Sequence, residues 1–251
     1  MVLTRRPERG GAAPRAAETG RDKAAGVRAM FSRIAPRYDL MNALMTCGRD
    51  QTWRRVAARL AAPAPGSLAL DLATGTGDLA LALLAETPVR AVVGVDFVEG
   101  MVRLGRAKLR TRTEGRVHLA VGDALALPFP DHAFGCVASA FLLRNLADLA
   151  TGLSEMRRVT TPGGSIVALE ITQPTLPGWR QVFRFYFHRI VPAVGALVSG
   201  DRDAYSYLPH SVDRFLPPGE LARLMTDIGL RDVRVRRVGL GTVTIHVGRA
   251  P

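Results

Sequence analysis

Short apolar runs alternate with amphipathic segments along the middle of the chain, and this alternation constrains the fold more than any other feature. Apolar runs of strand length occur at residues 68–73, 91–96, 117–121, 133–141 and 165–171. Helical spacing separates them at 78–86, 99–112 and 147–159. Strands that alternate with helices form right-handed βαβ units, whose strands pair in parallel and are covered on both faces. The sequence therefore predicts an α/β fold built on a parallel sheet.

The C-terminal part predicts two more strands and completes the expected sheet. A helical segment at 218–228 precedes strand patterns at 232–238 and 242–247. The link Gly239-Leu-Gly241 between these strands is short and rich in glycine, which favours an antiparallel hairpin. We therefore expect a Rossmann-like, seven-stranded, mostly parallel sheet that ends in this hairpin. Residues 174–216 interrupt the alternation and, being aromatic and rich in proline and arginine, predict a helical insertion.

Three regions are expected along the 251 residues. Residues 1–24 carry glycine, alanine, proline and arginine without hydrophobic periodicity, which predicts a disordered basic arm. Residues 25–62 have helical spacing, broken at Pro36, and predict an N-terminal helical cap. Residues 63–251 form the expected cofactor-binding domain, which contains the insertion at 174–216.

Charge and composition narrow the compartment and the partners. The 34 basic side chains exceed the 22 acidic ones by 12, an excess that attracts nucleic acid or an anionic membrane face. No run of about 18 uncharged apolar residues predicts a membrane span, and residues 1–23 lack the apolar stretch of a signal peptide. The two cysteines, Cys47 and Cys136, form neither a disulfide framework nor a paired metal motif, so we expect a cytoplasmic protein.

A glycine-rich turn follows the first predicted strand and points to a nucleotide-like ligand. The two glycines of Ala73-Thr-Gly75-Thr-Gly77-Asp78 let the backbone turn tightly and approach a ligand closely. Asp96 ends the second strand, 19 residues after Gly77, where a carboxylate accepts hydrogen bonds from both ribose hydroxyls. Asp123 follows the third strand and can receive an adenine amino group. Together these residues predict an adenosine site.

Two cofactor classes fit such a site. Residues 75–80 match the Gly-x-Gly-x-x-Ala form of the dinucleotide fingerprint. However, no tyrosine is followed four residues later by a lysine, so the reductase Tyr-x-x-x-Lys pair is absent. S-adenosylmethionine has no pyrophosphate and therefore needs neither a third glycine nor a phosphate-binding helix N-terminus. The C-terminal hairpin also fits S-adenosylmethionine better than a dinucleotide.

Several strings of the chain resemble the quinone-biosynthesis C-methyltransferase family. They lie at residues 31–42, 70–78, 124–131, 141–145, 158–164, 205–208 and 245–248. Tyr38-Asp-Leu-Met-Asn42 and Leu143-Arg-Asn145 are the most specific of them. The resemblance implies a class I methyltransferase fold with S-adenosylmethionine as the methyl donor. It also implies a prenylated quinol as the acceptor, with demethylmenaquinol favoured and a benzoquinol or another phenolic compound as alternatives.

The resemblance also assigns roles to residues of the predicted cofactor site. It implies contacts to S-adenosylmethionine from Thr76, Asp96, Asp123 and Ala124. Ala140 is expected to contact the cofactor where the family often has serine, and Asp71 either joins these contacts or holds the loop. Leu142 stands where the family usually has glycine, and we expect its larger side chain to narrow the acceptor pocket.

Methyl transfer to a ring carbon requires an activated acceptor. An aromatic carbon is a poor nucleophile, and deprotonation of an adjacent hydroxyl spreads negative charge onto the ring. We expect Arg144, just after the fourth strand, to stabilise the forming phenolate directly or through water. Asn145 and Tyr38 are expected to orient that water or the hydroxyl. The alternative is a structural ion pair between Arg144 and Asp148, four residues on.

The remaining expectations concern the insertion and the partners. The aromatic residues of the insertion at 174–216 are expected either to form a groove for a prenyl tail or to pack as a helical cap. Its arginines are expected to face either an anionic membrane or solvent. His188 and His210 are candidates to face the pocket, whereas His246 is expected to be packed. No cluster has metal-ligand spacing, so no metal is expected. An RNA methyltransferase is disfavoured because the basic residues are dispersed, and the oligomeric state, homo-oligomers included, is left open.

Overall fold

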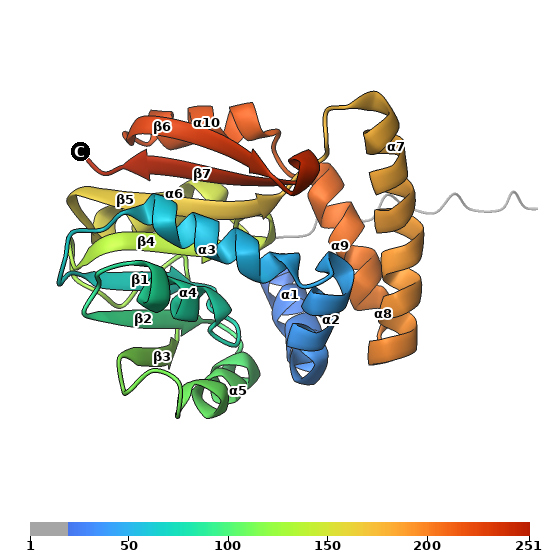
Figure 1. Ribbon diagram of the computed structural model, residues 1–251, viewed down its shortest axis with the longest axis horizontal. Helices are drawn as coiled ribbons and strands as arrows, with labels where there is room; N and C mark the ends of the chain where they lie inside the picture. Colours follow the sequence, from blue (N-terminus) through green and yellow to red (C-terminus); the bar gives the residue numbers. More distant parts are fainter. Residues whose placement is uncertain (1–19) are drawn as a thin grey trace, which may run out of the picture.

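The computed structural model describes residues 20–251, and in this part of the chain it contains the predicted seven-stranded sheet (Figure 1). The strands are β1 (Leu68–Leu72), β2 (Ala91–Asp96), β3 (Val117–Val121), β4 (Phe134–Ala140), β5 (Thr160–Ile171), β6 (Arg231–Val238) and β7 (Val243–Arg249). Their order is β3-β2-β1-β4-β5-β7-β6. Strands β1 to β5 pair in parallel, and β7 runs antiparallel to both β5 and β6. The predicted fold class is confirmed.

Strand β5 begins at Thr160, five residues before the predicted start at residue 165. The intervening Pro162-Gly-Gly164 resembles a turn, but the strand passes through it with Gly163 in the left-handed region (φ 72°). Gly164 allows β5 to approach β4 closely, because a Cβ there would lie 2.9 Å from the Gly135 carbonyl oxygen. Glycine and proline therefore mark an irregular strand here and not a loop.

Alternating residues of the strands face two hydrophobic layers. Leu70 and Leu72 face the layer that includes α6 (Leu149–Val159) and α10 (Pro218–Asp227). Ala69 faces the opposite layer, where α3 (Arg49–Ala61) and α4 (Asp78–Glu86) pack. Helix α5 (Glu99–Leu109) covers β3 through Val102 and Leu109. Both faces of the sheet are thus covered, as the alternation predicts.

The N-terminal region differs from its prediction in two respects. Helix α1 spans Gly20–Ile34, so residues 20–24 belong to a helix, and the rest of the predicted arm lies outside the described residues. Helix α1 is followed by the 3-10 turn Ala35–Arg37 and by α2 (Tyr38–Thr46). Helix α3, which was expected to belong to the cap, packs on the sheet instead. Its buried Ala57, Ala58 and Ala61 are small enough for close contact with the strands. The cap therefore consists of α1 and α2.

The predicted insertion is helical and joins α1 and α2 in one layer beside the sheet (Figure 1). It contains α7 (Pro177–Phe185), the π-helical turn Tyr186–Ile190, α8 (Val191–Ser199) and α9 (Arg202–Arg214). Met30 of α1, Met41 of α2 and Tyr205 of α9 share one hydrophobic cluster. Within residues 20–251, no helix is both long enough and apolar enough to cross a membrane.

Replacement of Gly195 by alanine tests how tightly this helical layer is packed. A Cβ at Gly195 would lie 2.2 Å from Cγ of Tyr205, so α8 and α9 must move apart. We expect Gly195→Ala to lower the free energy of unfolding by about 1–3 kcal/mol, measured by urea denaturation. Gly178→Ala is the matched control, because a Cβ there meets nothing within 4 Å. Equal stability of the two variants would contradict the packing described.

Candidate active site

The loops that follow β1, β2, β3 and β4 meet at one edge of the sheet, since parallel strands end there together. In the loop after β1, Gly75 and Gly77 have positive φ angles of 56° and 90°. A Cβ at Gly77 would lie 2.6 Å from the side chain of Leu109, and one at Gly75 would lie 3.6 Å from the ring of Tyr38. Their positive φ angles therefore favour glycine at both positions, and at Gly77 the close approach of Leu109 also leaves no room for a Cβ.

Asp96 joins this loop to the end of β2. Its Oδ2 accepts a hydrogen bond from the Gly75 N–H at 2.8 Å, and its Oδ1 accepts one from the Val98 N–H at 2.8 Å. Burial raises the pKa of Asp96, and these two hydrogen bonds oppose the rise. The carboxylate is thus fixed in orientation, while each oxygen retains a lone pair for a further donor.

Asp71 lies on β1 beneath the same loop and is almost fully buried. Its Oδ2 accepts a hydrogen bond from the Thr74 hydroxyl at 2.6 Å, while Oδ1 has no partner among the described residues. Burial raises the pKa of Asp71 to about 7. Asp71 also lines a small cavity of about 20 Å³ together with Arg54 and Ala140. Asp71 therefore holds the loop and lies in the wall of this cavity with one carboxylate oxygen unpartnered among the described residues.

Thr76 is tied to the helical layer by a network that the sequence did not reveal. The Thr76 hydroxyl donates to Asp39 of α2 at 2.6 Å. Lys108 of α5 donates to the other oxygen of Asp39 at 2.7 Å and also to Asp78. The other lysine of the chain is Lys23 on α1, and it donates to the Leu146 carbonyl oxygen at 2.6 Å. Both lysines thus hold the segment α1–α2 across the loops of the candidate site.

The remaining predicted cofactor residues lie along the same edge. Asp123 follows β3, is exposed, and accepts a hydrogen bond from the Leu125 N–H at 2.9 Å. Ala124 is buried beside it, and Ala140 ends β4 in the wall of the small cavity. The eight predicted cofactor residues therefore occupy the loops or strand ends of one edge. Their contacts with a cofactor stay a prediction.

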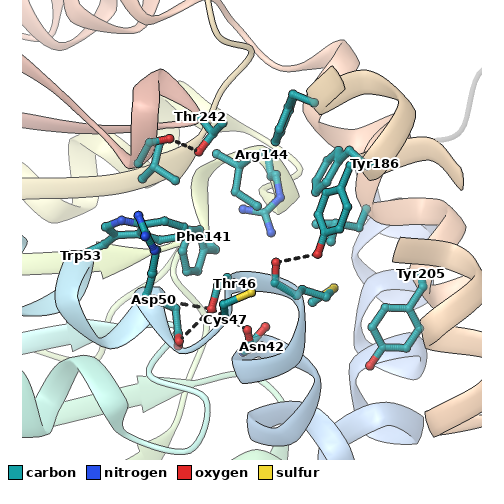
Figure 2. Close-up of a pocket in the computed structure, with 18 of the residues that line it drawn as sticks. Asn42, Thr46, Cys47, Asp50, Trp53, Phe141, Arg144, Tyr186, Tyr205 and Thr242 are labelled. Carbon is teal, nitrogen blue, oxygen red and sulfur yellow. Dashed lines mark hydrogen bonds between the residues drawn. The ribbon is translucent and has the colours of Figure 1, made fainter. Parts of the chain in front are cut away.

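A larger cavity of about 470 Å³ lies between the sheet edge and the helical layer (Figure 2). All three predicted catalytic residues line it: Tyr38, Arg144 and Asn145. Figure 2 shows Arg144 with Trp53 and Phe141 to one side and Tyr186 to the other. Tyr38 lines both this cavity and the small one, so it lies between them. The cavity size is typical of a small-molecule site.

Arg144 pairs with Glu170 of β5 and not with Asp148. Its Nη1 donates to Oε2 of Glu170 at 2.8 Å, and both side chains are more than nine-tenths buried. Asp148 instead caps α6, because its carboxylate accepts hydrogen bonds from the N–H and the hydroxyl of Thr151. The alternative of an Arg144–Asp148 ion pair is therefore wrong. Nε of Arg144 is buried and has no hydrogen-bond partner among the described residues.

Asn145 and Tyr38 have defined hydrogen-bonding states. The Asn145 amide nitrogen donates to the Phe141 carbonyl oxygen at 3.0 Å, and its oxygen accepts from the Tyr207 hydroxyl at 3.1 Å. Burial raises the pKa of the Tyr38 phenol, although the guanidinium of Arg54 opposes the rise. Tyr38 is consequently a neutral hydrogen-bonding group at physiological pH.

Several expectations about single residues are corrected. Leu142 packs in the core layer with α6 and lines neither cavity, so it does not narrow the pocket. His188 pairs with Asp213 at 2.7 Å, and neither His188 nor His210 lines either of the two cavities described above. His246 is buried in the sheet, as expected. Among residues 20–251, no group of three or more His, Cys, Asp or Glu side chains is arranged to hold a metal ion.

The sheet order, the glycine turn and the acidic residue that ends β2 define a class I methyltransferase. Solved structures share this fold. An S-adenosylmethionine-dependent methyltransferase from Thermotoga maritima aligns with a TM-score of 0.62 and 16% identity over 89% of this chain and 99% of that one. One from Aquifex aeolicus aligns with a TM-score of 0.56 and 18% identity over 85% and 98%. At such identities the likeness shows the fold alone.

Sequence comparison identifies the family within this class. The model of the ubiE/COQ5 methyltransferase family matches residues 18–250, and the chain belongs to this family. A demethylmenaquinone methyltransferase of Roseiflexus sp. is 46% identical over 90% of this chain and 94% of its own length. One from Thermus thermophilus is 46% identical over 88% and 100%. A ubiquinone/menaquinone biosynthesis C-methyltransferase of Geobacter sulfurreducens is 44% identical over 90% and 89%.

Substitution of Asp71 by asparagine tests the buried acid beneath the glycine turn. The folded-state pKa of about 7 exceeds the ordinary value of 3.8, so the folded protein resists ionisation of Asp71 more than the unfolded chain does. The free energy of unfolding therefore falls as pH rises from about 4 to 7. Asp71→Asn retains the acceptor for Thr74 without this cost. Relative to Asp71→Asn, the cofactor-free wild type should lose up to about 4 kcal/mol of unfolding free energy between pH 4 and 8. Parallel stability–pH curves from urea denaturation would contradict the assignment.

Proposed function

We propose that this chain transfers the methyl group of S-adenosylmethionine to a ring carbon of a prenylated hydroquinone, with demethylmenaquinol as the acceptor. The observation that carries the proposal is the buried guanidinium of Arg144 in the wall of a largely apolar cavity. Such a cation stabilises the negative charge that develops on a phenolate oxygen. The names of the similar proteins from Roseiflexus and Thermus support a naphthoquinol ring.

S-adenosylmethionine fits the residues around the glycine turn. Asp71, which has an unpartnered oxygen, and the buried Arg54, which also pairs with Asp50, line one small cavity. Their charges match the ammonium and carboxylate of an amino acid. At the other end, Asp96 offers lone pairs to ribose hydroxyls, and the exposed Asp123 offers an acceptor to an adenine amino group. The cofactor, when bound, supplies an electrophilic methyl group. Ala124 and Ala140 leave room beside it because their side chains are small.

Admission of the cofactor requires the segment α1–α2 to shift. The small cavity of about 20 Å³ is far too small for an amino acid. Its wall includes Tyr38 of α2, which the Asp39–Lys108 ion pair holds in place. These contacts are partly exposed and therefore weak individually, so they can open and reform around the bound cofactor.

The residues of the large cavity have separate roles in the proposed reaction. Arg144 stabilises the acceptor oxygen as its proton passes to water, which raises electron density at the neighbouring ring carbon. After that carbon has accepted the methyl group, it loses its own hydrogen as a proton to water, and the ring becomes aromatic again. Asn145, fixed by Phe141 and Tyr207, orients the hydroxyl or a water molecule beside it. Tyr38 lies between the two cavities, where the methyl group must pass from sulfur to carbon. Alignment of sulfur, methyl and carbon supplies much of the rate enhancement.

The helical layer also presents a surface suited to an anionic membrane, where a prenylated quinol resides. Its exposed apolar side chains on α7, the π-helical turn and α8 are Val182, Phe185, Ile190 and Leu197. Exposed arginines lie among them at Arg180, Arg184 and Arg189. Apolar and basic side chains on one helical surface favour the interface of an anionic bilayer. We include peripheral association through this surface in the proposal.

The central test is methyl transfer from labelled S-adenosylmethionine to demethylmenaquinol, with a benzoquinol and RNA as parallel acceptors. The wild type should label the naphthoquinol. Arg144→Gln, which keeps a hydrogen-bond donor toward Glu170, should lower kcat about 100-fold or more while calorimetric affinity for S-adenosylmethionine stays unchanged. Label in RNA alone, or full turnover by Arg144→Gln, would contradict the proposal.

A second test concerns the cofactor site alone. We expect Asp96→Ala to weaken S-adenosylmethionine binding about 10-fold or more, because ribose contacts and the loop anchor are lost together. Isothermal titration calorimetry measures the affinity directly. Asp131→Ala serves as control, since Asp131 is an exposed acid paired with Arg158. Equal affinity of both variants would exclude Asp96 from the cofactor site.

Membrane association is tested by sedimentation with vesicles that contain phosphatidylglycerol. Replacement of Phe185 and Leu197 by serine removes two apolar side chains that are 64% and 88% exposed, and the bound fraction should fall. Val235→Ser is the control, because Val235 is an exposed apolar residue of β6. Loss of binding in the control, or none in the double variant, would place the contact elsewhere.

A further inference from the structure

A buried glutamate supports the loop that carries Arg144. Glu170 lies near the end of β5, and its side chain is 1% exposed. Its Oε1 accepts a hydrogen bond from the Leu143 N–H at 2.6 Å, while Oε2 accepts one from Nη1 of Arg144 at 2.8 Å. Glu170 does not line the large cavity. The carboxylate of Glu170 therefore fixes both the backbone turn Leu143–Asn145 and the guanidinium of Arg144.

The end of β5 fixes the rest of this loop as well. The Leu169 carbonyl oxygen accepts a hydrogen bond from the Phe141 N–H at 2.7 Å, and Phe141 has a left-handed φ of 63°. A bulky residue in this region is strained and persists only where its surroundings determine it. The ring of Phe141 lines the cavity, with its centroid 5.7 Å from Cζ of Arg144. Adjacent residues of β5 thus determine the positions of both Phe141 and Arg144.

Stability alone is a weak reason for this ion pair. A buried carboxylate loses its hydration, and burial accordingly raises the pKa of Glu170, while Arg144 and the backbone donors oppose the rise. Buried ion pairs often contribute no more than well-packed apolar residues, because desolvation offsets their attraction. What a carboxylate supplies here, and an apolar side chain does not, is a fixed direction for the guanidinium.

We propose that Glu170 is a positioning residue, whose carboxylate directs the unpaired edge of the Arg144 guanidinium toward the acceptor oxygen. The inference rests on the proposed function for its chemistry. Nη1 is occupied by Glu170, the ring of Phe141 lies against the guanidinium, and Nε is buried without a partner among the described residues. Arg144 lines the large cavity, and Figure 2 shows its guanidinium directed into it. With Nη1 held by Glu170, Nε and Nη2 form the edge that is left for an acceptor oxygen.

The test compares Glu170→Gln with a matched control. Leu143 and Arg144 donate to different oxygens of Glu170, and Gln replaces one of these oxygens by an NH2 group that donates and does not accept, so one of the two contacts is lost. We expect kcat for the quinol to fall about 10-fold or more with little change in the KM for S-adenosylmethionine. The control is Glu155→Gln on α6, because Glu155 also accepts from a backbone N–H (Leu127, 2.8 Å) and from an arginine (Arg158 Nε, 2.7 Å). That variant should retain wild-type kcat.

Two readouts separate positioning from mere support of the fold. The acid limb of the kcat–pH profile should move to higher pH in Glu170→Gln, because a displaced guanidinium stabilises the phenolate less. The loss in kcat should shrink for a halogenated naphthoquinol, whose hydroxyl ionises more readily. An unchanged profile, with the same loss for both acceptors, would overturn the proposal. If Glu170→Gln fails to fold, Glu170→Asp keeps the charge but is too short for both contacts, and the same shifts are expected.

A third readout does not depend on turnover. Rotation of the Arg144 guanidinium, observed by NMR and assigned by its absence in Arg144→Gln, should be slow in the wild type and fast in Glu170→Gln. Equal rotation rates would refute the positioning role even if the quinol is not the substrate. Absence of methyl transfer by the wild type, together with slow rotation, would instead refute the proposed function and leave the role of Glu170 intact.

Discussion

Charged side chains buried at one edge of the sheet govern the geometry of the candidate site. Asp71, Asp96, Arg54, Arg144 and Glu170 are each less than 10% exposed. A buried charge is costly unless hydrogen bonds and opposite charges compensate it. At this edge the two arginines pair with carboxylates, Arg54 with Asp50 and Arg144 with Glu170. Loop N–H groups compensate two of the acids, since Gly75 donates to Asp96 and Leu143 donates to Glu170. The hydrogen bonds from loop N–H groups to these buried carboxylates therefore also fix the conformation of the loops.

The helical layer completes the site because it closes the same edge from the other side. Of 34 basic side chains, only Lys23 and Lys108 are lysines, and both hold α1 or α2 against the sheet domain. The ammonium of lysine reaches several acceptors as a compact charge on a flexible stem. Lys108 contacts Asp39, Asp78 and the Thr76 hydroxyl at once. The cofactor loop and the cap are therefore coupled through one side chain.

The sheet and much of the cofactor edge could be predicted, because local pattern determines them. Alternating apolar runs specify parallel strands, and strand ends place Asp96 and Asp123 together. Glu170 could not be found in this way, since it lies 26 residues from Arg144 and meets it only through the pairing of β4 with β5. Proximity in sequence favoured Asp148, whose carboxylate caps a helix instead.

Leu142 illustrates the same limit at a single residue. Its size suggested an obstruction of the pocket, but the direction of a side chain within an irregular turn is set by tertiary packing. The turn directs Leu142 into the core layer with Leu146 and leaves Arg144 at the cavity. Neighbouring residues of one loop thus have different roles, since Leu142 packs in the core and Arg144 lines the cavity.

The most direct measurement is a crystal structure of the protein with S-adenosylhomocysteine and a hydroxynaphthoquinol bound together. We predict that a ring oxygen lies about 3 Å from a guanidinium nitrogen of Arg144, with the adjacent ring carbon facing the sulfur. A quinol ring bound elsewhere, with Nε of Arg144 still unpartnered, would contradict the account.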